Sequence, residues 1–330
     1  MTFDTNKTGE FVRRQTGFRN WVGHDRSGKV TQFPSESGRY HLYVSLACPW
    51  AHRTVMMRKL KGLEDVIGLS IVDPVWNEQG WYFSDYPGAI QDSVNHLPDL
   101  ISLYRLADPK FSSEETTPVL WDKETKSIVN NESAEIIRML DLEFSAHAKN
   151  KRTFYPVKER AGIDAFMAEM YPVVNNGVYR AGFAKSQGAY ERAVKQLFAA
   201  LDHFEKVLLD RRYLCGDELT EADLCLFATL LRFDPVYVGH FKCNLKRIVD
   251  YPNLWGYTRD VYQTPGIAET CNLDHIKRHY YMSHPQINPT RIVPVGPEID
   301  YASPHHREEL HQRHQEQLIS EEDVLAGKLG

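Results

Sequence analysis

The sequence predicts an α/β domain followed by an all-helical domain. Residues 40–74 read as a strand, a helix and a second strand, and residues 117–142 read as a hairpin followed by a helix. From about residue 155 the apolar residues recur at helical spacing instead. A chain of 330 residues is also long enough for two domains. We expect four segments, which are an irregular arm (1–38), an α/β domain (39–150), a helical domain (151–283) and an extended segment with a tail (284–330).

Composition is that of an ordinary globular protein, with 42% hydrophobic and 25% charged residues. The net charge of −5 gives no electrostatic reason to expect nucleic acid or an anionic membrane as a partner. No apolar run is long enough to span a bilayer, and the amino end lacks the apolar core of a secretion signal. The histidines are scattered, so we expect no metal. Five widely spaced cysteines without a CxxC pair favour a reduced, cytoplasmic protein.

Residues 40–62 carry the first motif that points to chemistry. An alternating run from Tyr40 to Leu46 predicts a strand, and the apolar residues after Pro49 recur at helical spacing until Gly62, which suits a helix end. Proline is favoured at a first helical position, because its missing N–H would be unpaired there anyway. The pattern therefore places Cys48 at the amino end of a helix.

That position makes Cys48 the candidate nucleophile. The unpaired N–H groups and the helix dipole stabilise negative charge at an amino end, which favours a thiolate. We expect His52 and Arg53, one turn further along, to add positive charge. The alternative is that Cys48 is a small buried apolar residue, as most cysteines are. The strand–Cys-Pro–helix context favours the reactive thiol.

The almost continuously apolar run 66–74 predicts a buried strand parallel to the first one. Residues 75–113 show no clear period and are rich in aromatic residues, including Trp81. Such an insertion is expected to be a functional lid or a partly disordered loop.

Residues 117–130 predict a β-hairpin, and Asn131, Glu132 and Ser133 suit the start of a helix. The order β-α-β and then β-β-α, with a cysteine after the first strand and Pro118 opening the third, is the thioredoxin-like plan. In that plan the proline is cis, which costs less than at other residues. The backbone of Val119 would then be able to pair with an extended peptide.

Several patterns describe the remaining segments. The arm is expected to be anchored by Phe11, Phe18 and Trp21 and to pack on its own domain. Residues 190–208 follow helical spacing over five turns, and Thr220 with Asp223 forms a capping box, so Asp223 is interpreted as a cap and not a catalyst. Another helix opens at Tyr251-Pro252, and residues 284–297 are broken by prolines.

These features together resemble a glutathione transferase with a thioredoxin-like first half. Most classes of that family place Ser or Tyr at the first helix, where this chain has Cys48. Five strings resemble the Xi class, the glutathionyl-hydroquinone reductases, across residues 35 to 297: SLACPWAHRT, PVLWD, NNGVYRAGFA, YPNLWGYTRDVYQTPG and KRHYYMSH…INPTRIVPVGP.

The resemblance implies reduction of S-glutathionyl-hydroquinones. Cys48 would attack the glutathione sulfur and form a mixed disulfide, which a second glutathione would resolve to GSSG. The residue three positions after Cys48 is Ala51, which agrees with a one-thiol route. The resemblance also points to Tyr179 and to the pair Tyr280 and Tyr281 as phenolic donors, with Tyr280 slightly favoured over Tyr281.

The resemblance further implies that Trp81, the backbone of Val119, Glu132 and Ser133 hold glutathione. Arg53 is expected to be either a structural residue or one that supports the thiolate. The simpler alternatives are packing for Trp81 and a helix cap alone for Glu132 and Ser133.

One departure concerns residues 112–118, which read SSEETTP where the family is expected to carry a Gly-Arg. A basic contact to glutathione is then either missing or supplied elsewhere, for example by the arm.

Two other functions stay open at this point. One is a glutathione transferase, thioltransferase or reductive dehalogenase acting on another electrophile. The other is a transferase-like domain that binds partners without catalysis. The resemblance also implies a homodimer, although no dimer surface can be identified from one chain.

Overall fold

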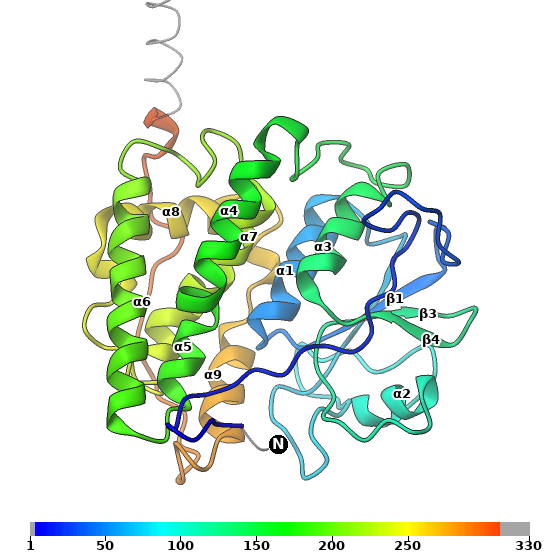
Figure 1. Ribbon diagram of the computed structural model, residues 1–330, viewed down its shortest axis with the longest axis horizontal. Helices are drawn as coiled ribbons and strands as arrows, with labels where there is room; N and C mark the ends of the chain where they lie inside the picture. Colours follow the sequence, from blue (N-terminus) through cyan, green and yellow to red (C-terminus); the bar gives the residue numbers. More distant parts are fainter. Residues whose placement is uncertain (1–3, 311–330) are drawn as a thin grey trace, which may run out of the picture.

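A computed structural model describes residues 4–310 of the chain. Figure 1 shows a small sheet with its helices on one side of the molecule and a bundle of helices on the other. The amino-terminal arm runs along the front and crosses from the helical bundle to the sheet (Figure 1). The α/β domain and the helical domain that the sequence predicts are thus both present.

The sheet has four strands in the order β2-β1-β3-β4. Strand β1 pairs in parallel with β2 and antiparallel with β3, and β3 pairs antiparallel with β4. This is the thioredoxin-like arrangement expected from the sequence. Their bounds are β1 Tyr40–Val44, β2 Gly68–Ile71, β3 Val119–Asp122 and β4 Ser127–Asn130.

Helix α1 (Pro49–Leu60) begins at Pro49 with Cys48 as its N-cap, as predicted. Gly62 lies just past its end with φ of +64°, a conformation that glycine adopts without strain. The helix packs against α3 (Ser133–Leu142) of its own domain and against α7 (Glu221–Arg232) of the helical domain. Because neighbours cover α1 on both sides, its first nine residues are nearly all buried, apart from Trp50.

Residues 75–113 are folded, so the alternative of a partly disordered loop is wrong, while a role as a functional lid stays a prediction. They contain helix α2 (Leu100–Ala107), whose N-cap Asp99 accepts a hydrogen bond from the Ser102 N–H. The segment also forms isolated bridges, one of them between Ile71 and Ile90. Its aromatic residues build a second hydrophobic cluster under the sheet, and this use in packing hides any regular period in the sequence.

The helical domain contains more helices than the sequence patterns indicate. The predicted segments form α6 (Gln187–Val207), α7 and α8 (Pro252–Gln263). The capping box of Thr220 and Asp223 is confirmed, since the Asp223 carboxylate accepts from the Thr220 N–H at 2.8 Å. Three helices had no predicted bounds: α4 (Arg160–Met170), α5 (Gly177–Gly182) and α9 (Leu273–Ser283).

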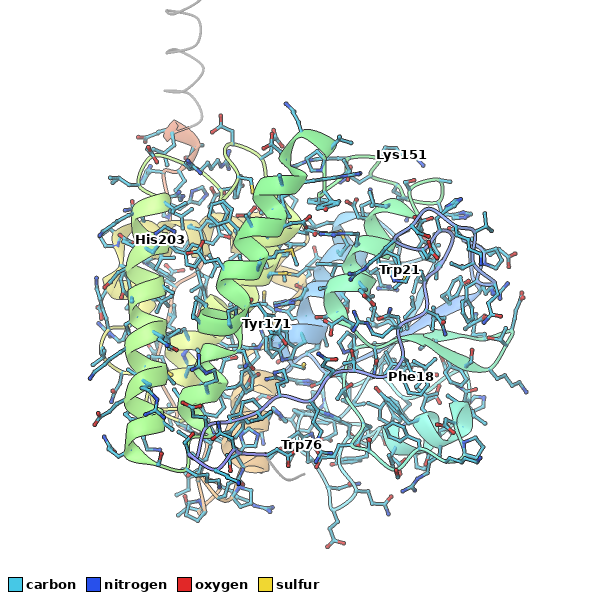
Figure 2. All side chains as sticks on the ribbon, in the orientation of Figure 1. Phe18, Trp21, Trp76, Lys151, Tyr171 and His203 are labelled. Atoms are coloured by element: carbon cyan, nitrogen blue, oxygen red, sulfur yellow. The ribbon has the colours of Figure 1, made fainter. Side chains whose placement is uncertain are left out.

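The arm contacts both domains, so the expectation that it packs on its own domain is incomplete. Phe18 lies 5.7 Å from the ring of Tyr104 in the first domain, and Figure 2 shows Phe18 and Trp21 over that side of the molecule. Phe11 instead lies 5.4 Å from Phe183, and Gly9 accepts from the Lys185 N–H, both in the helical domain. The arm therefore bridges the two domains.

Residues 284–297 contain turns but no helix or strand, as the prolines predict. The following residues return to the helical domain, where the Tyr301 hydroxyl donates to the Leu231 carbonyl at 3.1 Å. The end of the predicted tail, residues 311–330, lies outside the described residues. No helix in the described part of the chain is long and apolar enough to cross a membrane.

A buried ion pair fastens the end of α1. Lys61 and Asp141 are both 0% exposed, and the Lys61 Nζ lies 3.0 Å from Asp141 Oδ1. The same ammonium donates to the Arg152 carbonyl, while the other carboxylate oxygen accepts from Thr153 and from the Phe154 N–H. The pair thus ties α1 and α3 to the segment that leads into the helical domain.

We predict that Lys61→Met lowers the free energy of unfolding by about 3 kcal/mol, because it leaves the Asp141 carboxylate buried without its counter-charge. Urea titration measures the effect. Lys149→Met is the matched control, since its pair with Asp65 has side chains that are 68% and 78% exposed. Equal midpoints for the two variants would contradict the prediction.

Candidate active site

Cys48 lies where a strand, a helix and a cis proline meet. It is the N-cap of α1 and is partly exposed, and its Sγ lies 3.6 Å from the Thr117 carbonyl oxygen, toward which the S–H points. The Thr117–Pro118 peptide is cis, as expected from the thioredoxin-like plan. The amino end of α1 and the cis-proline loop thus bound the thiol on two sides, with an open face remaining for a ligand.

The expected positive charge on His52 is absent. His52 is fully buried, its Nε2 pairs with the Thr270 hydroxyl at 2.9 Å, and its Nδ1 accepts from the Arg232 guanidinium at 3.1 Å. Burial, together with the charge of Arg232, lowers the pKa of His52 well below its usual value. The imidazole is therefore neutral, because its surroundings offer it a cation rather than an anion.

Arg53 is also buried, and it connects the two helices that begin at the site. Its Nη1 lies 3.4 Å from the Ser133 hydroxyl at the start of α3, and its guanidinium carbon lies 4.5 Å from the centre of the Trp50 ring. It thus lies behind the pocket wall and positions residues that line the pocket.

Two of the three predicted tyrosines meet in the helical domain. The hydroxyls of Tyr179 in α5 and Tyr280 in α9 are 2.5 Å apart. Burial raises the pKa of both phenols, and the negative charge of Cys48 raises that of Tyr179 further. Both hydroxyls consequently stay protonated near neutral pH and can donate.

Tyr281 does not take part in this hydrogen bond, and its role as a catalytic residue stays a prediction. Its hydroxyl donates to the Pro235 carbonyl at 3.4 Å, and its ring lies against His240. Neighbouring residues of a helix point in directions about 100° apart, so Tyr281 and Tyr280 point in different directions.

Tyr237 also belongs to the hydrogen-bonded group of Tyr179 and Tyr280, although the sequence did not indicate it. Its hydroxyl lies 3.0 Å from that of Tyr280, and it is fully buried. It comes from a π-helical turn, Phe233–Tyr237, that follows α7, and Tyr171 comes from a similar turn, Tyr171–Asn175. Such turns insert one residue and re-aim side chains, often at functional sites, and no simple sequence pattern reveals them.

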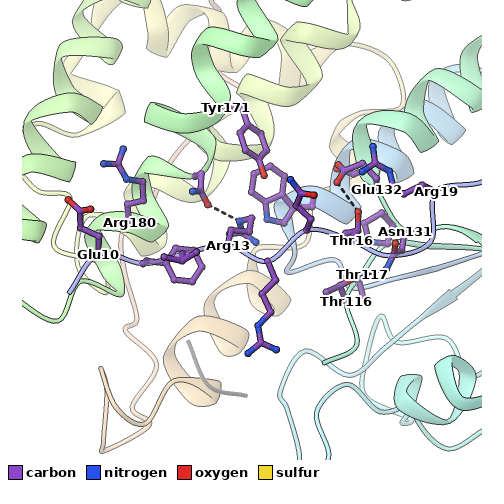
Figure 3. A pocket seen from close by; sticks show the side chains of 18 of the residues that line it. Glu10, Arg13, Thr16, Arg19, Thr116, Thr117, Asn131, Glu132, Tyr171 and Arg180 are labelled. Carbon is purple, nitrogen blue, oxygen red and sulfur yellow. Dashed lines mark hydrogen bonds between the residues drawn. The ribbon is translucent and has the colours of Figure 1, made fainter. Parts of the chain in front are cut away.

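A cavity of about 620 Å³ opens between the domains and the arm. Figure 3 shows Glu132 on the sheet side, Tyr171 on the helical side and Arg13 between them. The lining also includes Thr117, Pro118, Ser133 and the ring of Trp50. The cavity thus joins the cis-proline loop, the amino end of α3 and an aromatic wall.

The predicted binding residues fall into two groups. Glu132 and Ser133 line the cavity, where Glu132 is the N-cap of α3 and accepts from the Ala134 N–H at 3.3 Å. Val119 is buried beside Pro118, so only its backbone is near the cavity. Trp81 is 5% exposed and lies in the second hydrophobic cluster, stacked 4.7 Å from the His279 ring. The structure therefore does not place Trp81 on the cavity wall.

The arm contributes basic residues that line the cavity: Arg13, Arg14 and Arg19. Arg14 pairs with Asp4 and Arg19 with Glu135. Arg13 donates to Asn176 Oδ1 at 2.7 Å and lies 4.8 Å from the ring centres of both Trp50 and Tyr179. Among the described residues no carboxylate pairs with Arg13, so its charge is available to a ligand.

No group of three metal-ligating side chains occurs within residues 4–310. The donors around Cys48 are hydroxyls, backbone groups and guanidinium groups. Such a set suits a peptide thiol and an aromatic molecule rather than a cation.

Comparison with known proteins identifies the family. Residues 47–143 match the glutathione S-transferase N-terminal domain and residues 187–260 match the C-terminal domain. The chain therefore belongs to the glutathione transferases.

Within that family the chain belongs to the Xi class, the glutathionyl-hydroquinone reductases. It is 52% identical to glutathionyl-hydroquinone reductase YqjG of Escherichia coli, over 93% of this chain and 95% of that protein. It is 48% identical to glutathionyl-hydroquinone reductase PcpF of Sphingobium chlorophenolicum, covering 89% and 92%. The glutathione-bound structure of YqjG superposes with a TM-score of 0.86 at 53% identity, covering 88% of this chain and 96% of that one. The Xi transferase of Phanerochaete chrysosporium gives 0.86 at 49% identity, covering 91% and 96%.

Buried histidines surround the ring of Tyr280. His279 is its chain neighbour, and the rings of His240 and His284 lie 6.3 and 5.7 Å away. Burial lowers the pKa of His279 to about 3 and that of His240 to about 4. These neutral rings pack as aromatic side chains, with His279 Nδ1 bonded to the Pro74 carbonyl.

We predict that His279→Gln reduces the loss of stability between pH 7 and pH 5 by about 2 kcal/mol. In the unfolded chain this imidazole takes up a proton below about pH 6.5, but in the folded protein it does not do so until about pH 3. Its contribution is therefore present above pH 6.5 and is lost as the pH falls. Urea titrations at both pH values measure the difference, and parallel losses in the two proteins would contradict it.

Proposed function

We propose that this protein reduces S-glutathionyl-hydroquinones to hydroquinones, with glutathione as reductant. The observation that carries the proposal is the partly exposed Cys48 at the amino end of α1, beside the cis-proline loop whose Thr117 and Pro118 line the cavity. The ring of Tyr179, whose hydroxyl bonds to that of Tyr280, stacks on Trp50 of the cavity lining. The relatives named glutathionyl-hydroquinone reductases, which match nearly the whole chain, support the same reaction.

The cavity offers groups that suit glutathione. The Glu132 carboxylate is able to pair with the ligand's ammonium, and the Ser133 hydroxyl at the amino end of α3 is able to donate to a carboxylate. The backbone next to Pro118 would pair with the cysteinyl portion, as an added strand does. We assign Trp81 an indirect role, because its backbone N–H donates to Glu115 Oε1 at 3.1 Å within the segment that precedes the cis proline.

We further propose that the arm supplies the basic contact that residues 112–118 lack. That stretch contains no basic residue. Its Glu115 is buried and accepts a hydrogen bond from the backbone N–H of Trp81. Arg13 has a guanidinium in the cavity without a carboxylate partner among the described residues. A carboxylate of glutathione would complete its hydrogen bonds.

In the first step the Cys48 thiolate attacks the sulfur of the glutathionyl group. A sulfur–sulfur bond forms, the bond from sulfur to the aromatic carbon breaks, and its electron pair leaves with the ring. That carbon takes a proton, and the free hydroquinone departs. Tyr179 and Tyr280 have raised pKa values through burial, so their hydroxyls serve as donors to the ring oxygens. Trp50 and Tyr171 provide an aromatic wall for the ring.

In the second step a glutathione thiolate attacks the Cys48–glutathione disulfide. The products are GSSG and the Cys48 thiolate, so the two-electron reduction of the aromatic carbon balances the oxidation of two glutathione sulfurs, one from the thioether of the substrate and one from the free thiol. The residue in the resolving position is Ala51, which is why an external thiol is required. A thiol at position 48 is needed to remove glutathione from the substrate, since a serine cannot form the mixed disulfide.

We predict that one equivalent of glutathionyl-menadiol leaves a single glutathione on the protein, which dithiothreitol removes. Intact-mass measurement detects the adduct, and Cys48→Ala is expected to show none and to lose turnover. Cys215→Ala is the matched control, because burial raises the pKa of that thiol to about 12. Unchanged turnover in the Cys48→Ala protein would overturn the mechanism. Turnover of hydroxyethyl disulfide but not of the hydroquinone adduct would indicate a thioltransferase instead.

We predict different outcomes for the neighbouring tyrosines. Tyr280→Phe is expected to lower kcat about 100-fold, the range typical of a lost proton donor, whereas Tyr281→Phe is expected to leave kcat within about twofold. The reason is that only Tyr280 shares a hydrogen bond with Tyr179. Steady-state kinetics on both variants measure this, and similar losses in the two would contradict the assignment.

We also propose a cytoplasmic homodimer. All five cysteines are free thiols, which suits a reducing compartment.

A further inference from the structure

Arg232 is a completely buried arginine at the end of α7, directly behind the cysteine loop. Its Nε donates to the Ala47 carbonyl at 2.8 Å and its Nη2 to the Leu46 carbonyl at 2.9 Å. Its Nη1 donates to the Ala228 carbonyl at 2.7 Å and to His52 Nδ1. The side chain therefore reaches from the helical domain to the peptide that joins Ala47 to Cys48.

The charge of Arg232 has no acidic partner in the described part of the chain. Its four acceptors are three backbone carbonyls and one neutral imidazole, and none of the ion pairs of residues 4–310 includes it. A buried ion without a counter-charge is strongly disfavoured. The carboxyl end of α7 relieves part of that cost, since a helix favours a cation there.

We propose that Arg232 is a positioning residue for the reaction, which fixes the Leu46–Ala47 turn and supplies the buried positive charge that the Cys48 thiolate balances. This rests on the proposed role of Cys48 as nucleophile. The planar guanidinium bonds two adjacent carbonyls with Nε and Nη2 and reaches Ala228 and His52 with Nη1, a fixed geometry that an ammonium on a flexible stem does not hold. The positive charge that was expected from His52 thus comes from Arg232, which donates a hydrogen bond to His52.

The electrostatics of the neighbouring groups agree with this placement. Burial is the main cause that raises the pKa values of Tyr237 and Tyr280, and the charge of Arg232 acts against it at both phenols. The same charge also lowers the pKa of His52, whose burial is the larger cause. Arg232 therefore influences groups on several sides of the site, from α1 to α9.

Other charged or titratable groups around the thiol are few. Arg53 of α1 bonds to Ser133, and Arg13 of the arm lies over Trp50 and Tyr179. The pKa of His52 is lowered and the pKa values of the phenols of Tyr179 and Tyr280 are raised, so these three groups keep their charge near neutral pH. A change in the reactivity of the thiol near neutral pH therefore reflects ionisation of Cys48 and not of these neighbours.

The test measures alkylation of Cys48 by iodoacetamide from pH 4 to pH 9, with peptide mapping to follow this cysteine alone. In Arg232→Gln we expect the pH of half-maximal rate to rise by about one unit, so that alkylation at low pH is about tenfold slower than in the wild type. Arg232→Lys keeps the charge but loses the fork, so a rise of about half that size is expected.

Arg58→Gln is the matched control. Arg58 lies in α1 and, like Arg232, donates to backbone carbonyls, those of Ile67 and Glu64, but it does so at the end of α1 far from Cys48. We expect this variant to lose stability without moving the pH of half-maximal alkylation. A purely structural role for Arg232 predicts the same result for Arg232→Gln as for Arg58→Gln, and that result would overturn the proposal.

If Arg232→Gln does not fold, Arg232→Lys decides the question, since a half-maximal pH equal to the wild type then overturns the proposal. Alkylation requires neither glutathione nor a hydroquinone. A protein that fails to turn over hydroquinone adducts but shows the Arg232 effect would contradict the proposed function only.

Discussion

The burial of α1 between the two domains is the constraint on which the site depends. One side of this helix packs on α3 and the other on α7, while its amino end stays open at Cys48. A helix held on two sides cannot tilt without opening both interfaces, so the direction of its dipole at the thiol is fixed. The Lys61–Asp141 pair holds the opposite end, where both side chains are 0% exposed.

This placement divides the work of the site between the domains. The first domain supplies the thiol, the cis-proline loop and the amino end of α3, which are groups suited to a peptide. The helical domain supplies a buried cation bonded to the cysteine loop and a pair of phenols, one of which the charge of Cys48 reaches, and these groups suit charge and an aromatic ring. The arm closes the cavity from a third direction and adds a guanidinium. A site built in this way exists only when the domains are docked.

Burial also sets the protonation states. It keeps the hydroxyls of Tyr179, Tyr237 and Tyr280 protonated, and it keeps the surrounding imidazoles neutral. The site therefore contains many titratable groups, but few of them change charge near neutral pH. Because the phenols remain donors while the thiol is able to ionise, nucleophile and donors can act at the same pH.

The sequence by itself determined the local features. Alternation, helical spacing and the Cys48-Pro49 start specified the strands of the sheet and the first helix, because these patterns follow from hydrogen bonding and burial within short segments. The family strings also singled out Tyr179 and the pair Tyr280 and Tyr281. Helix α2 was missed because it is only eight residues long and lies within a segment of turns and isolated bridges, although its buried residues Leu100, Ile101, Leu103 and Tyr104 share one face.

Tertiary structure alone decided the contacts between distant residues. It separated Tyr281 from Tyr280, brought in Tyr237 through a π-helical turn, and moved Trp81 from the cavity into the core. It also replaced the expected charge of His52 by that of Arg232, which is 180 residues away in the chain. The physical reason is that charge and hydrogen bonding in a buried site depend on which side chains share the space, and local sequence patterns do not record that.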